Sequence, residues 1–168
     1  REILVEDVLK ALPAGALPLV ESVLAAAGPL GFGVHLIGGP LRDLLLEREI
    51  RDVDLIVDAK GVSDGAGVLA RAAAPPGAKV VEHARFGTAR IETAAGAVDL
   101  AGLRCETYAR PGALPEVSPG SLEQDLLRRD FSVNALALCL TGPARARVID
   151  VAEGLRDLQE RSLRILHG

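Results

Sequence analysis

The hydrophobic positions of this 168-residue chain fall into short runs separated by glycine and proline, and their spacing predicts both strands and helices. Short runs that are apolar throughout, or that alternate with polar residues, are typical of strands. Such runs occupy residues 33–37, 53–57, 78–83, 88–93, 97–103 and 145–151. Apolar residues spaced three or four apart predict helices over residues 2–12, 17–27, 40–47, 65–74 and 153–163, and one from an N-cap at Ser121 that continues over 125–140.

The order of these elements sets the fold class. Only the early strand–helix–strand portion could be parallel, because parallel neighbours need a long crossover connection. The three strands over residues 78–103 should form an antiparallel meander. A GxGxxG motif is missing and the strands do not keep alternating with helices, which disfavours a Rossmann sheet. The pattern therefore predicts a mixed α/β (α+β) fold whose mostly antiparallel sheet of about five strands is flanked by helices.

The composition narrows the class of protein. Hydrophobic residues make up 49% of the chain and aromatic residues only 2%, so the core must consist of Leu, Val, Ile and Ala. No apolar run approaches the roughly 18 residues of a membrane span. The first residues are acidic and amphipathic, unlike a signal peptide, and the spacing of Cys105 and Cys139 fits free thiols in a reducing compartment. We therefore predict a cytoplasmic location, no membrane partner and no disulfide partner.

The net charge of −4 argues against a domain that coats nucleic acid. Affinity for nucleic acid comes largely from basic residues that neutralise phosphates. A nucleic-acid enzyme with this composition must therefore confine its basic residues to one cleft.

A pair of acids on a predicted strand is the sharpest candidate for chemistry. Asp52 and Asp54 are two residues apart, so in a strand they point to the same side, roughly 6.6 Å apart. Such close carboxylates repel each other unless a cation neutralises them or one is protonated, and Mg²⁺ is often held by few carboxylates plus substrate phosphates. Asp99 becomes a third carboxylate if its strand lies beside theirs. The alternative is that these acids are solvated, with Arg48 or Arg51 as partners.

A glycine turn supplies a candidate anion site. Gly38 and Gly39 follow the strand at 33–37, and Pro40 suits the first position of the next helix because it lacks an N–H there. Free N–H groups at a helix start bind anions such as a triphosphate, and Arg42 adds a charged contact. Asp43 is expected to brace this helix start. The alternative is an ordinary strand-to-helix turn.

A third group of polar residues lies in the helix predicted over residues 125–140. Asp130 and Asn134 would share one face at i, i+4, where they could bind ribose hydroxyls, and Arg129 could hold phosphate. The opposite side would carry an apolar stripe of Phe131, Ala135 and Leu138. The alternative is a solvated polar face beside the core.

Together, these segments resemble the family of class II tRNA nucleotidyltransferases (CCA-adding enzymes) and bacterial poly(A) polymerases. The matching stretches cover about residues 34–167: LIGGPLRDLL, RDVDLIV, LRCETYARPG, LEQDLLRRDFSVNALAL and VIDVAEGLRDLQERSLRILH. The resemblance implies a nucleotidyltransferase fold and a two-metal mechanism with Mg²⁺. By residue, it implies Asp52, Asp54 and Asp99 as catalytic metal ligands, Gly38, Gly39 and Arg42 at the triphosphate, Arg129, Asp130 and Asn134 at the incoming nucleotide, and Arg104 facing the cleft or the primer.

The function implied by the resemblance is template-independent addition of C, A or both to the 3′ end of tRNA. The substrates would be ATP and/or CTP, and pyrophosphate would be released. A poly(A) polymerase acting on other RNAs, or a non-catalytic nucleotide-binding module, remains an alternative. Residues 1–150 would form the catalytic head and residues 151–168 the start of a helical neck. The family's base-selecting Glu-Asp-x-x-Arg motif does not occur in this sequence, and the histidines receive no role.

Overall fold

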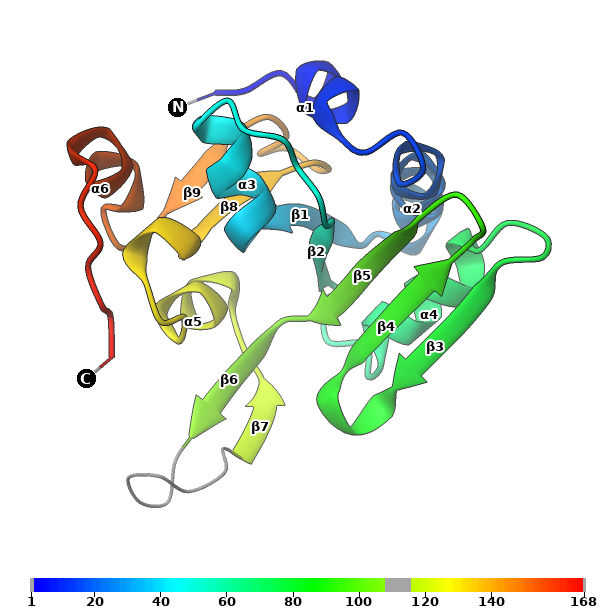
Figure 1. The fold of residues 1–168 in the computed structure, drawn as a ribbon. Coiled ribbons are helices and arrows are strands. Elements are labelled where there is room, and N and C mark those ends of the chain that lie inside the picture. The colour runs from blue at the N-terminus through cyan, green and yellow to red at the C-terminus, as the bar shows by residue number, and fades with distance from the viewer. Residues whose placement is uncertain (1, 108–115, 168) are drawn as a thin grey trace.

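One seven-stranded sheet organises the chain, and the computed structural model describes residues 2–107 and 116–167. The strands follow the spatial order β3-β4-β5-β2-β1-β8-β9 (Figure 1). Their bounds are β1 Gly33–Ile37, β2 Asp54–Asp58, β3 Lys79–His83, β4 Thr88–Glu92, β5 Ala97–Gly102, β8 Leu136–Cys139 and β9 Val148–Asp150. A separate two-stranded sheet consists of β6 Arg104–Thr107 and β7 Glu116–Pro119. The predicted mixed, mostly antiparallel class is confirmed, but the main sheet has seven strands rather than about five.

The pairing of β1 with β2 differs from the prediction. These two strands are antiparallel, whereas the parallel pair is β2 with β5. The connection between β1 and β2 contains one short helix, α3 Gly38–Leu45, which is about 12 Å long at about 1.5 Å per residue. The chain therefore does not cross back over the sheet, and β2 starts at the edge where β1 ends. As a result, Gly38 and Asp54 lie at the same edge. The meander of β3, β4 and β5 is antiparallel, as predicted.

The remaining helices cover the sheet and enclose the core. Their bounds are α1 Val5–Ala11, α2 Leu17–Leu30, α4 Gly65–Ala73, α5 Leu122–Leu127 and α6 Gly154–Glu160, with 3₁₀ turns η1 Ala84–Phe86 and η2 Ser132–Asn134. Helices α2 and α4 pack against each other, and α4 lies behind the β3–β4–β5 meander (Figure 1). The larger core cluster between these helices and the sheet is built almost entirely from Leu, Val, Ile and Ala, as the composition requires.

The long helix predicted over residues 125–140 is wrong. Helix α5 ends at Leu127, the turn η2 follows, and β8 is a strand. All four residues of β8 are buried, and a continuous apolar run is typical of a strand covered on both faces. The predicted stripe of Phe131, Ala135 and Leu138 therefore does not exist as a helical face. By contrast, the Ser121 N-cap forms a complete capping box with Gln124, as the sequence predicted.

The two cysteines are free thiols in the structure. Burial raises the pKa of the Cys139 thiol. Among the described residues the longest helix is α2, with 14 residues, and no described helix has the length and apolar character to cross a membrane.

Candidate active site

Three carboxylates meet at the edge of the sheet where β2 begins. Asp54 is the first residue of β2 and pairs in parallel register with Asp99 of β5, so their backbones lie one strand spacing apart, about 4.8 Å. Asp52 precedes the strand and is exposed. Each acid lines two of three adjoining hollows: Asp54 and Asp99 share the first, Asp54 and Asp52 the second, and Asp52 and Asp99 the third. The structure thus brings together the acids that the sequence singled out, although Asp52 lies outside the strand.

The electrostatics of this edge disfavour a charged Asp54. Burial raises the pKa of Asp54, and the carboxylates of Asp99 and Asp52 raise it further, against the smaller opposing effects of Arg129 and Arg90. Among the described residues, no side chain forms a hydrogen bond or ion pair with Asp54. Asp99 differs, because Arg90 of β4 pairs with its carboxylate and also donates from Nε to Glu92 at 2.9 Å.

The glycine turn lies beside these acids. Gly39 lines the same hollow as Asp52 and Asp54. Gly38 has φ of +65°, a left-handed conformation that favours glycine. A Cβ at Gly38 would lie 3.2 Å from Nη1 of Arg129, and a Cβ at Gly39 would lie 3.6 Å from Nη2 of Arg42. Two guanidinium groups therefore lie close to the backbone of this turn.

The helix after the turn starts earlier than predicted. Its N-cap is Ile37, so Gly38 is the first helical residue and Pro40 the third, not the first. A glycine pair can complete the first turn of the helix because it tolerates the backbone conformation required there. Helix α3 has no side-chain cap, so no side chain occupies the N–H groups of its first turn, which borders the hollow at Gly39.

Arg42 is held in place by two neighbours. It donates from Nε to Oδ1 of Asp43 and from Nη1 to Oδ1 of Asn134, both at 2.9 Å. Asp43 thus braces the arginine, and Asn134 in η2 reaches the site from a segment 92 residues away in sequence. The η2 turn, rather than a helix, brings Asn134 here.

Arg128 and Arg129 are held by a single buried carboxylate. Asp125 is fully buried in α5. Its Oδ1 accepts from Nη2 of Arg128 at 2.9 Å, and its Oδ2 accepts from Nη2 of Arg129 at 3.0 Å. Nε of Arg129 is buried and has no hydrogen-bond partner in the described part of the chain. Sequence reasoning missed Asp125, although its i, i+3 and i, i+4 spacing to the two arginines was a signal for such pairs.

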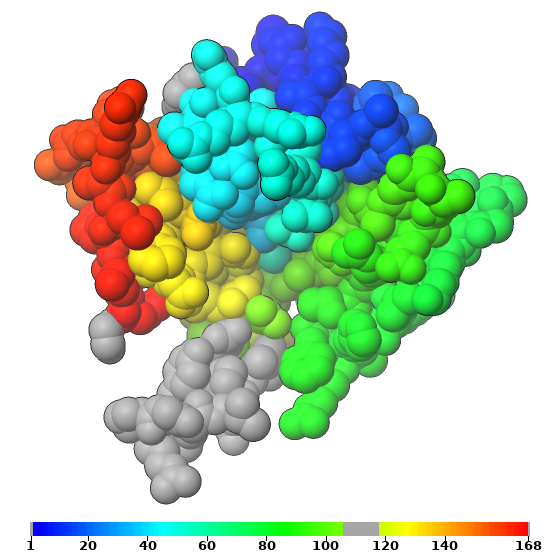
Figure 2. All heavy atoms as spheres, in the orientation of Figure 1, coloured from blue at the N-terminus to red at the C-terminus, as the bar shows by residue number. Residues whose placement is uncertain are grey.

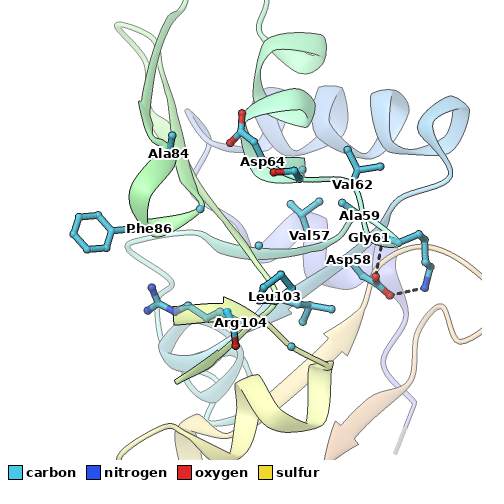
Figure 3. A pocket seen from close by; sticks show the side chains of 18 of the residues that line it. Val57, Asp58, Ala59, Gly61, Val62, Asp64, Ala84, Phe86, Leu103 and Arg104 are labelled. Carbon is cyan, nitrogen blue, oxygen red and sulfur yellow. Dashed lines mark hydrogen bonds and ion pairs between the residues drawn. The ribbon is translucent and has the colours of Figure 1, made fainter. Parts of the chain in front are cut away.

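Asp130 and Arg104 are the two remaining predicted site residues, and only Arg104 lines a hollow beside the acids. Asp130 is exposed and is not among the residues that line the three hollows beside the acids; its backbone carbonyl accepts from the N–H of Leu166 at 2.9 Å. Asp130 and Asn134 therefore do not share a helical face. Arg104 lines the hollow of Asp54 and Asp99 and also a second hollow, of about 330 Å³, at the other end of β2 (Figure 3).

Basic residues gather in the hollow that Asp54 shares with Asp99. This hollow of about 630 Å³ is also lined by Lys79, His83, Arg90, Arg104, Arg128 and Arg129. In Figure 2 the surface is recessed between the cyan α3, the yellow α5 segment and the green β4 and β5. Five of the 19 lysine and arginine residues of the chain thus line this one hollow, together with His83.

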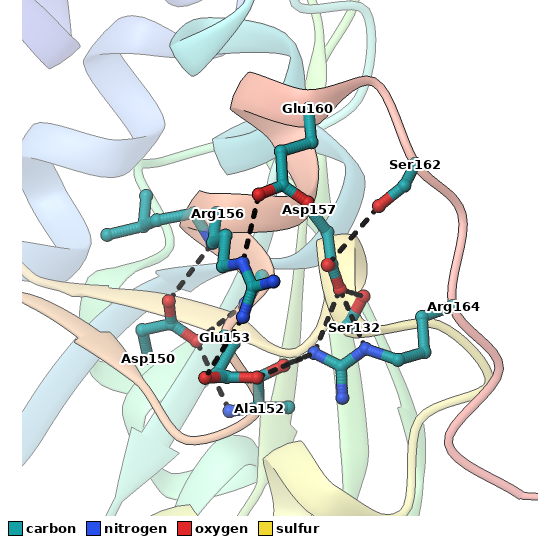
Figure 4. A network of polar contacts seen from close by, with 11 residues as sticks. Ser132, Asp150, Ala152, Glu153, Arg156, Asp157, Glu160, Ser162 and Arg164 are labelled. Atoms are coloured by element: carbon teal, nitrogen blue, oxygen red, sulfur yellow. Dashed lines mark hydrogen bonds and ion pairs between the residues drawn. The ribbon is translucent and has the colours of Figure 1, made fainter.

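A polar network ties the last described segment to η2 (Figure 4). Asp157 of α6 pairs with Ser132 and accepts from Nε of Arg164 at 3.1 Å. Asp150 accepts from the backbone N–H groups of Gly154 and Leu155 at 2.9 and 3.0 Å. These contacts fix the backbone of η2, which carries Asn134.

The donor set suits a divalent cation that is shared with a ligand. No described group of three or more His, Cys, Asp or Glu side chains is arranged to hold a metal by itself. Asp52 and Asp54 nevertheless provide two carboxylates whose mutual repulsion a cation would relieve. Mg²⁺ is commonly bound by one or two carboxylates together with substrate phosphates. The residues therefore fit a metal that binds with a nucleotide.

Comparison with known proteins agrees with this geometry. Residues 34–164 match the family model described as Poly A polymerase head domain. The chain is 41% identical over 133 residues to an A-adding tRNA nucleotidyltransferase of Aquifex aeolicus, covering 79% of this chain and 16% of that protein. It is 44% identical over 133 residues to a CC-adding tRNA nucleotidyltransferase of Deinococcus radiodurans, covering 79% of this chain and 34% of that protein.

A solved structure of a CCA-adding enzyme in an apo form superposes with a TM-score of 0.81 at 31% sequence identity. The match covers 99% of this chain and 38% of that chain. The chain therefore spans well under half the length of these relatives.

Proposed function

The chain belongs to the Poly A polymerase head domain family, and from this premise we propose that it is the catalytic head of a template-independent nucleotidyltransferase. The reaction is the addition of C, A or both to the 3′ end of tRNA, from CTP and/or ATP, with release of pyrophosphate. Residues 1–150 form this head, and residues 151–168 begin a helical neck. We expect the enzyme to act in the cytoplasm, where tRNA is matured.

One observation carries the proposal: Asp54, which no described residue neutralises by direct contact, lies beside a glycine turn flanked by two braced arginines. An ionised carboxylate kept partly buried among other carboxylates destabilises the fold unless a cation joins it or it takes up a proton. A turn with free N–H groups and two guanidinium groups attracts phosphate. The two features side by side suit a nucleoside triphosphate bound with a metal.

The side chains divide the work of binding. The N–H groups of Gly38 and Gly39, with Arg42 and Arg129, hold the triphosphate. Because its carbonyl oxygen accepts from Arg42, Asn134 offers its amide N–H groups to a ribose hydroxyl. The family resemblance assigns Asp130 to the incoming nucleotide. Its side chain is exposed and would contact the ribose from the outer margin of the site. Arg104 faces the primer.

Asp52, Asp54 and Asp99 would hold Mg²⁺. Nucleotidyltransferases generally use divalent metal, which activates the attacking 3′-hydroxyl and neutralises charge on the phosphates. For Asp99 to take part, Arg90 has to release its carboxylate. Catalysis then consists of positioning and charge neutralisation, without a covalent enzyme intermediate.

The nucleotide that is added depends on parts of the enzyme outside this chain. Relatives named as A-adding and CC-adding match it almost equally well, so the head alone does not distinguish them. The test uses the full-length protein with tRNAs that lack one, two or three terminal nucleotides, supplied with one nucleoside triphosphate at a time. We expect addition of nucleotide to tRNA that depends on a divalent metal. Failure of every tRNA to accept a nucleotide, with extension of an unstructured oligoadenylate instead, would show a poly(A) polymerase.

A further inference from the structure

The β3–β4–β5 meander has one covered face and one open face. Alternate residues of the three strands, among them Ala89, Ile91, Val98 and Leu100, are buried on the side where α4 lies. The other set of alternate residues lines the hollow of Asp54: Lys79, Val81, His83, Thr88, Arg90, Glu92, Asp99 and Ala101. We call this set the open face. In the described part of the chain it borders a hollow rather than a packed helix.

The register of the strands leads from the acids directly onto this face. Asp54 of β2 pairs with Asp99, Asp99 with Arg90, and Arg90 with Val81. Lys79 and His83 flank Val81 on the same side of β3. Because each strand adds about 4.8 Å, Val81 lies on the order of 10 Å beyond Asp99. The row thus begins at the carboxylates and ends at an apolar residue between two basic ones.

The position of the glycine turn indicates from which side of β2 each substrate reaches the acids. In the sheet order, β1 and its Gly38–Gly39 turn lie on one side of β2, whereas β5, β4 and β3 lie on the other. In phosphoryl transfer the attacking and leaving oxygens are roughly in line, on opposite sides of the phosphorus. A triphosphate held on the β1 side therefore requires the attacking hydroxyl to come from the β5 side, across the open face.

We propose that the open face binds the sugar-phosphate backbone of the acceptor RNA just upstream of its reacting 3′ end. Lys79 and His83 contact phosphate, and Val81 lies under the RNA between them. This inference rests on the proposed function and adds the location of the second substrate. Lys79 is suited to the role because its side chain is 72% exposed and, among the described residues, pairs only with Glu92, at 3.8 Å. Lysine in such a setting exchanges a weak surface pair for a phosphate.

The lysines of this chain provide an internal control, because there are only three: Lys10, Lys60 and Lys79. In the full-length protein, acetylation of each amine is measured by mass spectrometry with and without tRNA lacking its terminal nucleotides. Binding of RNA is expected to protect Lys79 several-fold and to leave Lys10 and Lys60 unchanged. Equal reactivity of Lys79 with and without RNA overturns the proposal. So does protection of Lys79 in the free protein, which would mean that protein, not RNA, covers the face.

Kinetics of Lys79→Ala give a second readout. The KM for tRNA is expected to rise about 3- to 10-fold, and the slope of log affinity against log salt to fall by about one. The KM for the nucleotide and kcat at saturating tRNA should stay at wild-type values. Lys10→Ala is the matched control, since that side chain is 77% exposed and pairs with Asp7 at 3.3 Å on α1. An unchanged tRNA KM, or equal changes in both KM values, contradicts the assignment.

The two proposals fail in different ways. If Asp54→Asn abolishes nucleotide addition while Lys79 shows neither protection nor a change in KM, only the RNA path is wrong. If Asp54→Asn retains full activity, the proposed function is wrong and the RNA path loses its basis.

Discussion

The two ends of strand β2 carry the same residue type in opposite electrostatic situations. Asp58 closes the strand: burial works against its charge, but hydrogen bonds and charge from Lys60 outweigh burial and lower the pKa of its carboxyl. Asp54 opens the strand, and there burial is reinforced by Asp99 and Asp52, so its pKa is raised. At one end of β2, Lys60 of this chain neutralises Asp58. At the other end, no described residue pairs with Asp54, and its charge is left for a ligand to neutralise.

Asp125 shows that this chain pairs an acid when it buries one completely. Two arginines share its carboxylate, and no part of its side chain is exposed. An uncompensated buried charge is strongly destabilising, so full burial requires such partners. Asp54 is only partly buried, has no such partner among the described residues, and faces a hollow in which a ligand can take the place of a protein cation. The contrast between a paired and an unpaired carboxylate is what supports the proposed role of Asp54.

Of the variants that test the difference between Asp54 and Asp58, we expect Asp54→Asn to have the largest effect, which is a loss of activity. If Asp54 holds the metal as proposed, its removal forfeits several kcal/mol of charge stabilisation in the transition state, which corresponds to on the order of 10³-fold in rate. Nucleotide addition to tRNA by the full-length protein is the measurement. Asp58→Asn, at the other end of the same strand, is the matched control and should keep wild-type activity. Similar rates for the two variants would contradict the proposed functional difference between Asp54 and Asp58.

Asp125→Asn should lower both stability and affinity for nucleotide. The amide cannot balance two guanidinium groups, so the free energy of unfolding should fall by about 3 kcal/mol, measured by urea denaturation. The KM for nucleoside triphosphate should rise about 10-fold, because Arg129 loses the bond that directs it toward Gly38.

Ser121→Ala controls for stability in that experiment. It removes the N-cap of the same helix and should lower the free energy of unfolding by about 1 kcal/mol, with no change in the nucleotide KM. If Asp125→Asn also leaves that KM unchanged, its carboxylate is structural only.

Much of the meander and of the acidic edge was predictable from local pattern. The strands at 33–37, 78–83, 88–93 and 97–103 alternate in a way that local sequence reveals, and the Ser121–Gln124 capping box needs only four residues. The acids and the glycine turn were identified because strand geometry places neighbours on one side. Their assembly could not be derived this way, since the parallel pairing of Asp54 with Asp99 depends on the order of strands across the sheet.

The failures had one physical origin, which is that tertiary contacts decide ambiguous segments. The apolar run that forms β8 satisfies both helical and strand patterns, and burial between β1 and β9 selects the strand. Strand β7, Glu116–Pro119, was not among the strands predicted from the sequence. The bond from Arg42 to Asn134 joins segments whose contact no local spacing indicates, whereas Arg90 and Asp99 lie on neighbouring strands of the predicted meander and only their exact register was not predicted.

A smaller effect concerns stability and pH at Asp54. Its folded pKa is raised, so the folded state holds the proton more tightly than the unfolded state and stability falls as pH rises above the ordinary carboxyl value. Asn cannot ionise, so Asp54→Asn should be more stable than wild type at neutral pH and lose that advantage below about pH 4. Urea midpoints across this pH range are the measurement. Added Mg²⁺ with nucleotide should raise the wild-type midpoint more than that of the variant.

The smallest effect is expected at Asp58, and its sign is opposite. The folded pKa of Asp58 is lowered, so its ionised form stabilises the fold above the unfolded carboxyl value, and this contribution disappears as pH falls through the folded pKa. Because the Lys60 side chain of this pair is largely exposed to solvent and Asp58 is only partly buried, Asp58→Asn should reduce stability at neutral pH by only about 0.5 kcal/mol. Plotted against pH, the stability differences of Asp54→Asn and Asp58→Asn should therefore have opposite signs near pH 7 and converge in acid. Curves of the same sign would mean that Asp54, like Asp58, is neutralised by the protein itself, and that the two ends of β2 do not differ in the way the structure indicates.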